Sequence, residues 1–218
     1  MNKMDLKELC RLNSECILVS NAEFDTLGMI TSKYPGKRVL SYIASDKYIE
    51  DLLDNKNIAA IICTQEMYDK NPDFINYGII LSENPKKTFF DIHNKLADME
   101  FYWKKSPNDI SQTAKISEKA IIGEHSIQIG DNTIIEAGVV IHPGTIIGKN
   151  VIIRSGTQIG SSGFQFNNTG DSVLSVKSAG RVVIKDNVEI QYNTCVDRGL
   201  LGGDTVLDCD VKVDNLVH

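Results

Sequence analysis

The chain has 218 residues and a formal net charge of −6, with 23 basic side chains against 29 acidic ones. This acidic balance is atypical of proteins that bind the phosphate backbone of nucleic acids, which present basic surfaces. No run of 18 apolar residues occurs and the first twelve residues are too polar for a secretion signal, so the sequence predicts a cytoplasmic protein without a membrane span. The five cysteines lack CxxC spacing, so we expect reduced thiols and neither a zinc site nor a disulfide framework.

The first hundred residues predict a small α/β domain. Short apolar runs, typical of buried strands, occupy residues 39–43, 58–63 and 78–81. Helical stretches are expected at residues 6–12, 46–53 and 85–97. Asp5 is the expected cap of the first helix, while Asn84 caps the third, with Pro85 at its first position. Because the strands alternate with helices, we assign residues 1–105 to this domain.

The second half of the chain carries an isoleucine at every sixth position, namely Ile129, Ile135, Ile141, Ile147, Ile153 and Ile159. Helices repeat every three or four residues and ordinary strands every two, so neither explains a period of six. This period is the signature of a β-helix built from hexapeptides, in which three short strands make one triangular coil of 18 residues. The isoleucines should point into the coil, and the small or β-branched residue four places later should fill its corner.

The six-residue register extends beyond this core on both sides. It begins upstream at Ile110 and resumes downstream at Ile184 and again at Leu207. Residues 161–182 and 198–205 lack the period and are predicted to form two excursion loops, where solenoids often carry functional residues. We therefore assign residues 106–218 to an incomplete β-helix domain. The register stops one strand short of a full coil, so we expect a truncated form of a longer protein; alternatively, another subunit or a swapped segment covers the end.

Four sequence blocks in this domain resemble one enzyme family. They are GFQF at 163–166, AGRVVIKDNVEI at 179–190, NTCVDRG at 193–199 and VKVDNLVH at 211–218. In this order and spacing they are similar to the UDP-3-O-(3-hydroxyacyl)glucosamine N-acyltransferases of lipid A biosynthesis. The resemblance implies a left-handed parallel β-helix, a homotrimer and transfer of a hydroxyacyl group to the 2-amine of a UDP-glucosamine derivative. The donor would be an acyl-carrier-protein thioester or acyl-CoA, with no bound cofactor.

The segment LSYIASDKY resembles the uridine-binding pattern of that family, an aromatic residue, an asparagine and a tyrosine at three-residue spacing. The resemblance implies that Tyr42, Ser45 and Tyr48 bind the nucleotide. Ser45 stands where the family has asparagine, whose amide offers both a donor and an acceptor to uracil, so nucleotide specificity could be altered. The two tyrosines could instead be core aromatics.

The family's catalytic base is a histidine that would fall three residues beyond His218. A histidine suits this step because its unperturbed pKa of about 6.5 allows proton removal near neutral pH. His218 is the nearest candidate for a substitute base; the alternative is that it lines the cleft without transferring a proton. The other histidines lack the spacing of a metal site, so we expect no metal.

Four further residues are candidates for substrate binding, each with a structural alternative. Phe164 could cover the sugar or acyl chain, or pack back onto the coil or onto a neighbouring subunit. Asp197 could contact substrate, or fix a corner and a subunit contact together with Arg198. Asp214 and Asn215 could line the sugar pocket, although turn geometry alone favours such residues.

Two other functions remain open at the level of sequence. The same solenoid serves many acyl acceptors, so a sugar acetyltransferase that uses acetyl-CoA is one alternative. The other is a catalytically incomplete protein that binds a nucleotide sugar or acts as a scaffold.

Overall fold

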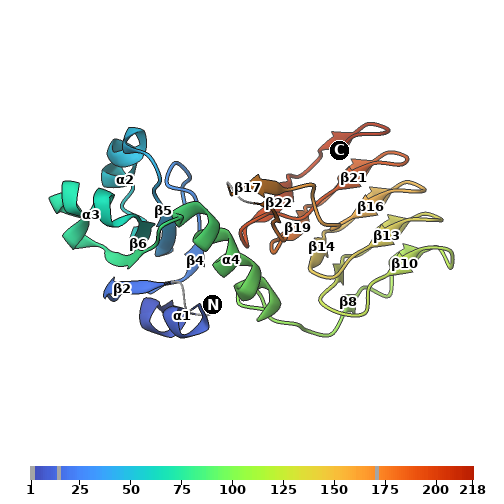
Figure 1. Ribbon diagram of the computed structural model, residues 1–218. Helices are drawn as coiled ribbons and strands as arrows, with labels where there is room; N and C mark the ends of the chain where they lie inside the picture. The colour runs from blue at the N-terminus through green and yellow to red at the C-terminus, as the bar shows by residue number, and fades with distance from the viewer. Residues whose placement is uncertain (1–2, 14–15, 170–171) are drawn as a thin grey trace. The chain divides into compact units, whose positions relative to one another are not determined.

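The computed structural model describes residues 3–13, 16–169 and 172–218 and divides the chain into two compact units. The first comprises Met1–Trp103 together with Gln165–Val176, and the second comprises Lys104–Phe164 and Lys177–His218 (Figure 1). The chain thus leaves the second unit after Phe164, contributes a short segment to the first unit and then returns.

The first unit is built on a five-stranded sheet in the order β2-β7-β6-β5-β4. Its strands are β2 (Ile17–Ser20), β4 (Thr26–Leu27), β5 (Val39–Tyr42), β6 (Ile58–Cys63) and β7 (Gly78–Leu81). Only β2 runs antiparallel to its neighbour. The three central strands, β5 to β7, are mostly buried, which is why they read as continuous apolar runs. A second, two-stranded sheet pairs β1 (Met4–Asp5) with β3 (Glu23–Phe24).

One helix, α1 (Leu6–Leu12), precedes this sheet, and the others follow its strands β5, β6 and β7. These are η1 (Asp46–Tyr48), α2 (Ile49–Asp54), α3 (Gln65–Lys70), η2 (Pro72–Asn76) and α4 (Pro85–Asp98). Both predicted caps are confirmed: a side-chain oxygen of Asp5 accepts from the Glu8 amide at 2.7 Å, and one of Asn84 accepts from the Lys87 amide at 3.0 Å. Ser45, Thr64 and Asn84 stand at the N-caps after β5, β6 and β7. Three helical N-termini therefore meet at the carboxyl edge of the sheet.

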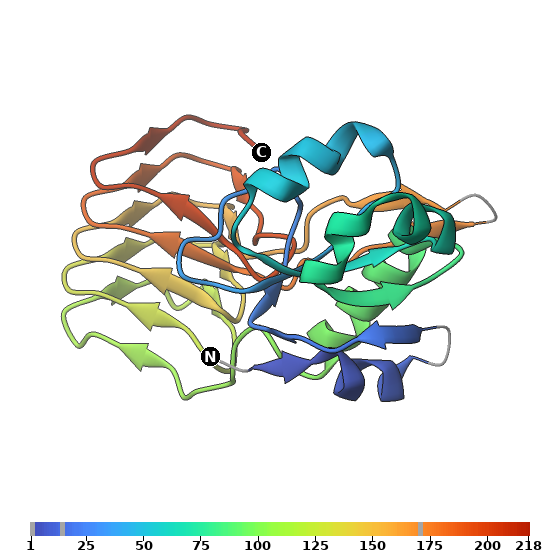
Figure 2. The ribbon, with the colours of Figure 1, turned by 90° about the vertical axis from the view of Figure 1, so that its left-hand side faces the viewer.

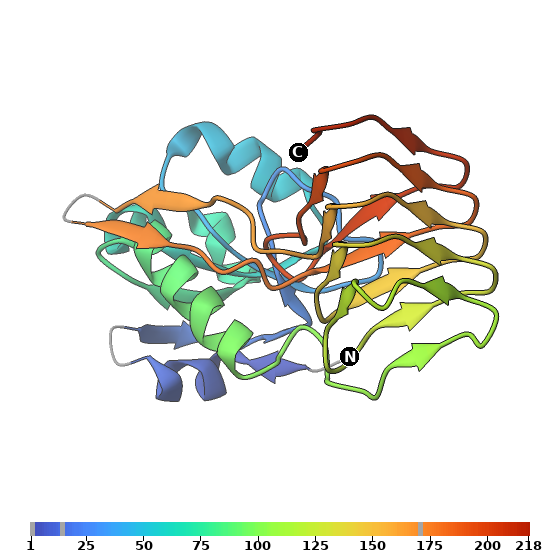
Figure 3. The same ribbon diagram turned by 90° about the vertical axis from the view of Figure 1, so that its right-hand side faces the viewer.

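The second unit consists of stacked three-stranded turns, visible edge-on in Figures 2 and 3. One face has the order β22-β19-β14-β11-β8, the second β23-β20-β15-β12-β9 and the third β10-β13-β16-β21, all with parallel pairing. The strands are β8 (Asp109–Ile110), β9 (Lys115–Ile116), β10 (Ile121–Ile122), β11 (Gln128–Ile129), β12 (Ile134–Ile135), β13 (Val140–Ile141), β14 (Thr145–Ile147), β15 (Ile152–Ile153), β16 (Gln158–Ile159), β19 (Arg181–Ile184), β20 (Glu189–Ile190), β21 (Cys195–Val196), β22 (Asp204–Leu207) and β23 (Lys212–Val213). This arrangement fits a left-handed β-helix.

The interior of the coil follows the six-residue period. The six isoleucines from Ile129 to Ile159 are at most 3% exposed and form one apolar cluster. The residues four places later are fully buried: Thr133, Val139, Thr145, Val151 and Thr157. The Thr133 hydroxyl donates to the Gly148 carbonyl at 2.8 Å and accepts from the Val151 amide at 3.1 Å. A buried hydroxyl at this position therefore links one coil to the next.

One corner of the coil is formed by asparagines in the left-handed backbone region. Asn132, Asn150 and Asn187 have φ values of 57°, 55° and 62°. The side-chain amide nitrogen of Asn132 donates to the side-chain oxygen of Asn150 at 3.4 Å, and that of Asn150 donates to the side-chain oxygen of Asn187 at 3.3 Å. Asparagine tolerates this conformation better than most residues and forms a ladder along the stack.

Both predicted excursions end earlier than the sequence suggested. The first ends where β19 begins at Arg181, and it contains an antiparallel hairpin of β17 (Phe166–Asn168) and β18 (Val173–Ser175). The second ends at β22, because Asp204 and Thr205 already pair with β19. The Arg181 guanidinium donates to both Asp204 carboxylate oxygens, at 3.0 and 2.9 Å, and so holds this register.

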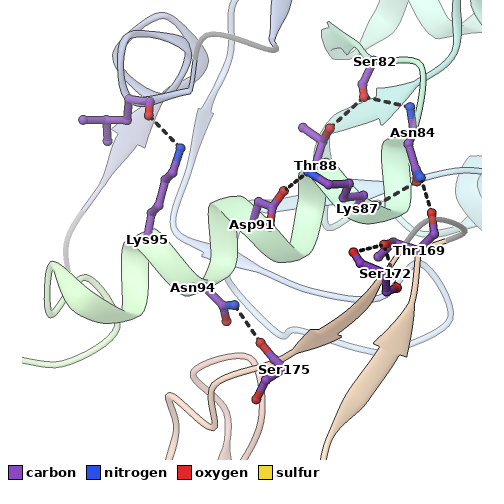
Figure 4. Close-up of polar contacts among 11 residues, drawn as sticks. Ser82, Asn84, Lys87, Thr88, Asp91, Asn94, Lys95, Thr169, Ser172 and Ser175 are labelled. Atoms are coloured by element: carbon purple, nitrogen blue, oxygen red, sulfur yellow. Dashed lines mark hydrogen bonds and ion pairs between the residues drawn. The ribbon is translucent and has the colours of Figure 1, made fainter.

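The hairpin packs along α4 within the first unit (Figure 4). The Asn84 side-chain amide donates to the Thr169 carbonyl at 2.8 Å, and the Asn94 amide donates to the Ser175 carbonyl at 2.9 Å. Asn84 therefore has two roles, because its oxygen caps α4 while its nitrogen holds the hairpin.

Candidate functional site

A pocket of about 240 Å³ opens at the carboxyl edge of the sheet in the first unit. It is lined by Met29, Ile30, Thr31, Tyr42, Ala44, Ser45, Tyr48 and Lys86. The structure thus brings together the three residues that the sequence singled out for nucleotide binding. They converge because β5 ends at Tyr42 and η1 begins directly after Ser45.

Tyr42 lines this pocket and packs against two aromatic rings. Its ring centroid lies 5.0 Å from that of Phe89 and 6.1 Å from that of Phe90, both on α4. Burial, with a smaller contribution from Tyr48, raises the pKa of the Tyr42 phenol above its ordinary value. The phenol therefore stays neutral at physiological pH, and the ring is an oriented aromatic wall.

Ser45 and Tyr48 lie at the rim. Ser45 has extended backbone at the N-cap of η1, yet its hydroxyl does not cap that helix. Among the described residues this hydroxyl has no hydrogen-bond partner, so it is available to a ligand. The Tyr48 side chain is partly exposed, and the Lys47 ammonium lies 4.5 Å from its ring centroid. The rim thus offers a second aromatic face and a hydroxyl.

Lys86 is a pocket residue that the sequence analysis missed. It is half-buried in the first turn of α4 and, among the described residues of the lining, is the only charged one. Local sequence signals only the helix start, through Asn84 and Pro85. That this turn borders the loop after β5 follows from packing of α4 on the sheet, which no short motif encodes.

Two other pockets of the first unit differ in charge. One, of about 520 Å³, shares Ala44 and Ser45 with the first pocket but is also lined by Asp46, Glu66 and Glu83. The other, of about 400 Å³, is lined by Asp51 and Asp54 together with lysines and asparagines. The described lining of the pocket that contains the two tyrosines has no carboxylate.

In the second unit, Phe164 and Asp197 lie at the first excursion. Phe164 is 92% exposed in the single chain, so its contact with substrate or with a neighbouring subunit stays a prediction. A carboxylate oxygen of Asp197 accepts a hydrogen bond from the Ser161 hydroxyl. The neighbouring Arg198 donates to the Gly160 carbonyl at 2.8 Å, and burial lowers the pKa of its guanidinium. These contacts fix the corner where the excursion leaves the coil.

Asp214, Asn215 and His218 lie on the last described turn and are exposed. An Asp214 carboxylate oxygen accepts from the Asn215 amide at 2.8 Å, and the Asn215 side chain accepts from the Tyr192 amide at 3.2 Å. Both residues therefore build the turn, as turn chemistry predicts. Within the described ranges, His218 makes no hydrogen bond or ion pair.

The described residues contain no cluster of three or more potential metal ligands among histidine, cysteine and acidic side chains. In the same ranges, every helix is too short or too polar to cross a lipid bilayer.

Comparison with known proteins connects both units to one group of enzymes. The family "Bacterial transferase hexapeptide (six repeats)" matches residues 126–161. A UDP-3-O-acylglucosamine N-acyltransferase from Caulobacter vibrioides is 40% identical over 104 residues, which cover 48% of this chain and 24% of that enzyme. A second, from Legionella pneumophila, is 29% identical and covers 98% of this chain and 68% of the enzyme. A solved variant of perosamine N-acetyltransferase from Caulobacter crescentus is 13% identical, and the match covers 86% of this chain and 96% of that enzyme's chain. The TM-score is 0.23, so this match carries no structural conclusion.

The match to the first of these relatives spans about a quarter of that enzyme's length, whereas the match to the second spans about two thirds. The second match extends over nearly the whole of this chain, and the first reaches 40% identity. Together with the period-six coil, these findings show that the chain is similar to hexapeptide-repeat transferases and, over most of its length, to the UDP-3-O-acylglucosamine N-acyltransferases.

Proposed function

We propose that this protein is an N-acyltransferase of lipid A biosynthesis that acylates the 2-amine of a UDP-glucosamine derivative. The observation that carries the proposal is the pocket in which Tyr42, Ser45 and Tyr48 converge without a carboxylate. Two aromatic walls suit a planar base, and a serine hydroxyl can donate to or accept from the polar edge of uracil. The matched relatives are named for a UDP-linked acylglucosamine, which supports uridine as the base.

The reaction joins the sugar amine to the carbonyl carbon of a thioester. The amine nitrogen attacks this carbon, a base removes one N–H proton, and the tetrahedral intermediate collapses with loss of the thiol. General-base catalysis contributes roughly 10²–10⁴-fold to such steps. In this proposal His218 is the candidate base within the chain, and Asp214 and Asn215 lie beside it in sequence on the same turn. Phe164 and Asp197 are the candidates for contact with the sugar or acyl chain.

The proposed donor is a hydroxyacyl group on acyl carrier protein, with acyl-CoA as the alternative carrier. The acceptor is UDP-linked, and the protein acts in the cytoplasm as a homotrimer. No prosthetic group takes part, because amine attack on a thioester needs only a base and donors to the oxyanion.

An acylation assay with the full chain tests the function. Hydroxyacyl-carrier protein, hydroxyacyl-CoA and acetyl-CoA are offered in separate arms with UDP-3-O-acylglucosamine, and the N-acylated product is measured by mass spectrometry. We expect product from a hydroxyacyl donor. Tyr48→Ala should raise KM for the UDP-sugar, whereas Ile75→Ala, an exposed change elsewhere in the same unit, should not.

The other outcomes separate the alternatives. Product from acetyl-CoA alone would identify a sugar acetyltransferase instead. Binding of the UDP-sugar without turnover from any donor would identify a non-catalytic nucleotide-sugar-binding protein. An unchanged KM in Tyr48→Ala would remove the pocket from the account.

A further inference from the structure

The pocket with the two tyrosines has an unusual charge balance for this chain. The protein carries a net charge of −6, and both neighbouring pockets contain carboxylates. Among the described residues that line the tyrosine pocket there is no carboxylate, and Lys86 carries the one formal charge. Its lining is otherwise apolar or hydroxyl-bearing, so the electrostatic preference of this site is for an anion.

Lys86 is also not used by the fold. The next residue, Lys87, pairs with Asp91 at 2.7 Å, and Lys95 farther along α4 donates to the Leu12 carbonyl at 3.0 Å (Figure 4). Among the residues that the structure describes, Lys86 has neither an ion-pair nor a hydrogen-bond partner. An ammonium group that lines a pocket without a neighbouring carboxylate is electrostatically uncompensated, which makes a bound anion favourable.

The position of Lys86 on α4 adds to this preference. The helix has 14 residues, and no acidic side chain lies in its first turn. The aligned peptide dipoles place partial positive charge at that end, next to the ammonium group. Asn84 caps the helix and also holds the hairpin, so the turn that carries Lys86 is fixed from both sides.

The volume of the pocket indicates which part of a nucleotide it can enclose. At about 240 Å³ the pocket lies below the range of roughly 300–1,000 Å³ that encloses a drug-sized ligand. A base between the tyrosines would therefore leave its phosphates near the mouth of the pocket.

We propose that Lys86 binds the phosphates of the nucleotide and makes this pocket select nucleoside diphosphates over nucleosides. This inference rests on the proposed function, because it assigns a phosphate contact to the same pocket. It adds a specificity residue that neither the sequence pattern nor the comparisons assign.

Calorimetric titration of the full chain with uridine, UMP, UDP and inorganic pyrophosphate tests the proposal. In the unaltered protein UDP should bind more tightly than uridine. Lys86→Gln should weaken UDP binding about 5- to 30-fold, the range expected for losing one charged hydrogen bond at a partly exposed site. Binding of uridine should change less than about twofold, because the base contacts remain. Added salt should weaken UDP binding more in the unaltered protein than in Lys86→Gln.

Lys87→Gln is the matched control, since it removes the same charge one residue away but outside the pocket lining. It should leave UDP affinity within about twofold of the unaltered value. Equal loss in both variants, or none in Lys86→Gln, would overturn the assignment. Pyrophosphate that binds as tightly as UDP, and is insensitive to Tyr48→Ala, would show a plain anion site and also overturn it. Failure of the unaltered protein to bind either uridine or UDP would instead contradict the proposed function.

Discussion

At the scale of single residues, the corner positions of the coil show how one side chain meets two requirements. Thr157 and Thr194 are fully buried, and their hydroxyls donate to carbonyls of the next coil at 2.8 and 2.7 Å. Valine has nearly the same shape and fills the same position at Val139 and Val151. The sequence can alternate between them because threonine satisfies its own hydroxyl inside the stack.

The inward isoleucines should dominate the stability of the coil. Ile153 is fully buried, and Ile153→Ala should lower the free energy of unfolding by about 2–5 kcal/mol because it leaves a cavity that the neighbouring coils cannot close. Ile121→Ala, at a side chain that is 63% exposed, should change it by less than about 0.5 kcal/mol. Urea denaturation monitored by circular dichroism measures both. Equal effects would contradict the inward placement of the six-residue register.

At the scale of elements, charged side chains connect neighbouring coils. Arg154 on one coil donates to Glu136 on the preceding coil at 2.8 Å and to Glu189 on the following coil at 2.7 Å. Hydrogen bonding to Arg154 lowers the pKa of Glu136 below its ordinary value, and burial opposes this only in part. The three side chains act as one ion-pair network along a face of the coil.

This network predicts a pH dependence of stability. Because the folded pKa of Glu136 is depressed, its stabilisation is present above the ordinary carboxyl pKa and is lost as pH falls through the lowered folded value. Arg154→Met should therefore lower the melting temperature at pH 7, and the difference from the unaltered protein should shrink toward pH 3. Thermal melts across this range measure it. A difference that is constant with pH would assign the effect to packing of the arginine stem.

The hairpin is the second element whose attachment can be tested. Asn94→Ala removes the hydrogen bond to the Ser175 carbonyl without touching the cap of α4. Loss of one such bond corresponds to roughly 0.5–1.5 kcal/mol, so hydrogen exchange of the amides in β18 should become about 2- to 10-fold faster. Exchange in β19 serves as the internal reference. Unchanged exchange in β18 would show that the hairpin is held by other contacts.

Sequence was sufficient for those features that are encoded locally. The caps at Asp5 and Asn84, the three central strands and the period-six register all rest on neighbouring residues, and each is present in the structure. The short edge strands β2 and β4 were missed because half-exposed or two-residue strands carry little pattern. Two other features depend on tertiary packing, which local patterns do not contain. One is the contact between the hairpin and α4, in which Asn84 and Thr169 are 85 residues apart in sequence. The other is the shared pocket of Lys86 and Tyr42.

The candidate site residues also differ in how far the sequence alone could identify them. Tyr42, Ser45 and Tyr48 are close in sequence and line one pocket. The candidates of the second unit lie at turns and an excursion, where contacts to the fold account for Asp197, Asp214 and Asn215. Their contact with substrate stays a prediction.

At the scale of the whole molecule, the flat faces of the coil predict self-association. Ile134 and Ile152 occupy adjacent outward positions on one face, and Val183 and the half-exposed Val206 occupy them on another. Apolar faces of this kind suit packing about a three-fold axis. Sedimentation velocity should therefore show a trimer of the 24.2 kDa chain. A stable monomer at micromolar concentration would contradict this expectation.

The central claim is that the first unit binds the nucleotide of the acyl acceptor in the pocket between Tyr42 and Tyr48. Hydrogen–deuterium exchange of the full chain, with and without saturating UDP-N-acetylglucosamine, tests it most directly. The account predicts slower exchange across residues 42–48 and the first turn of α4, and no such protection in Tyr48→Ala. Unchanged exchange at both segments under saturating ligand would contradict it.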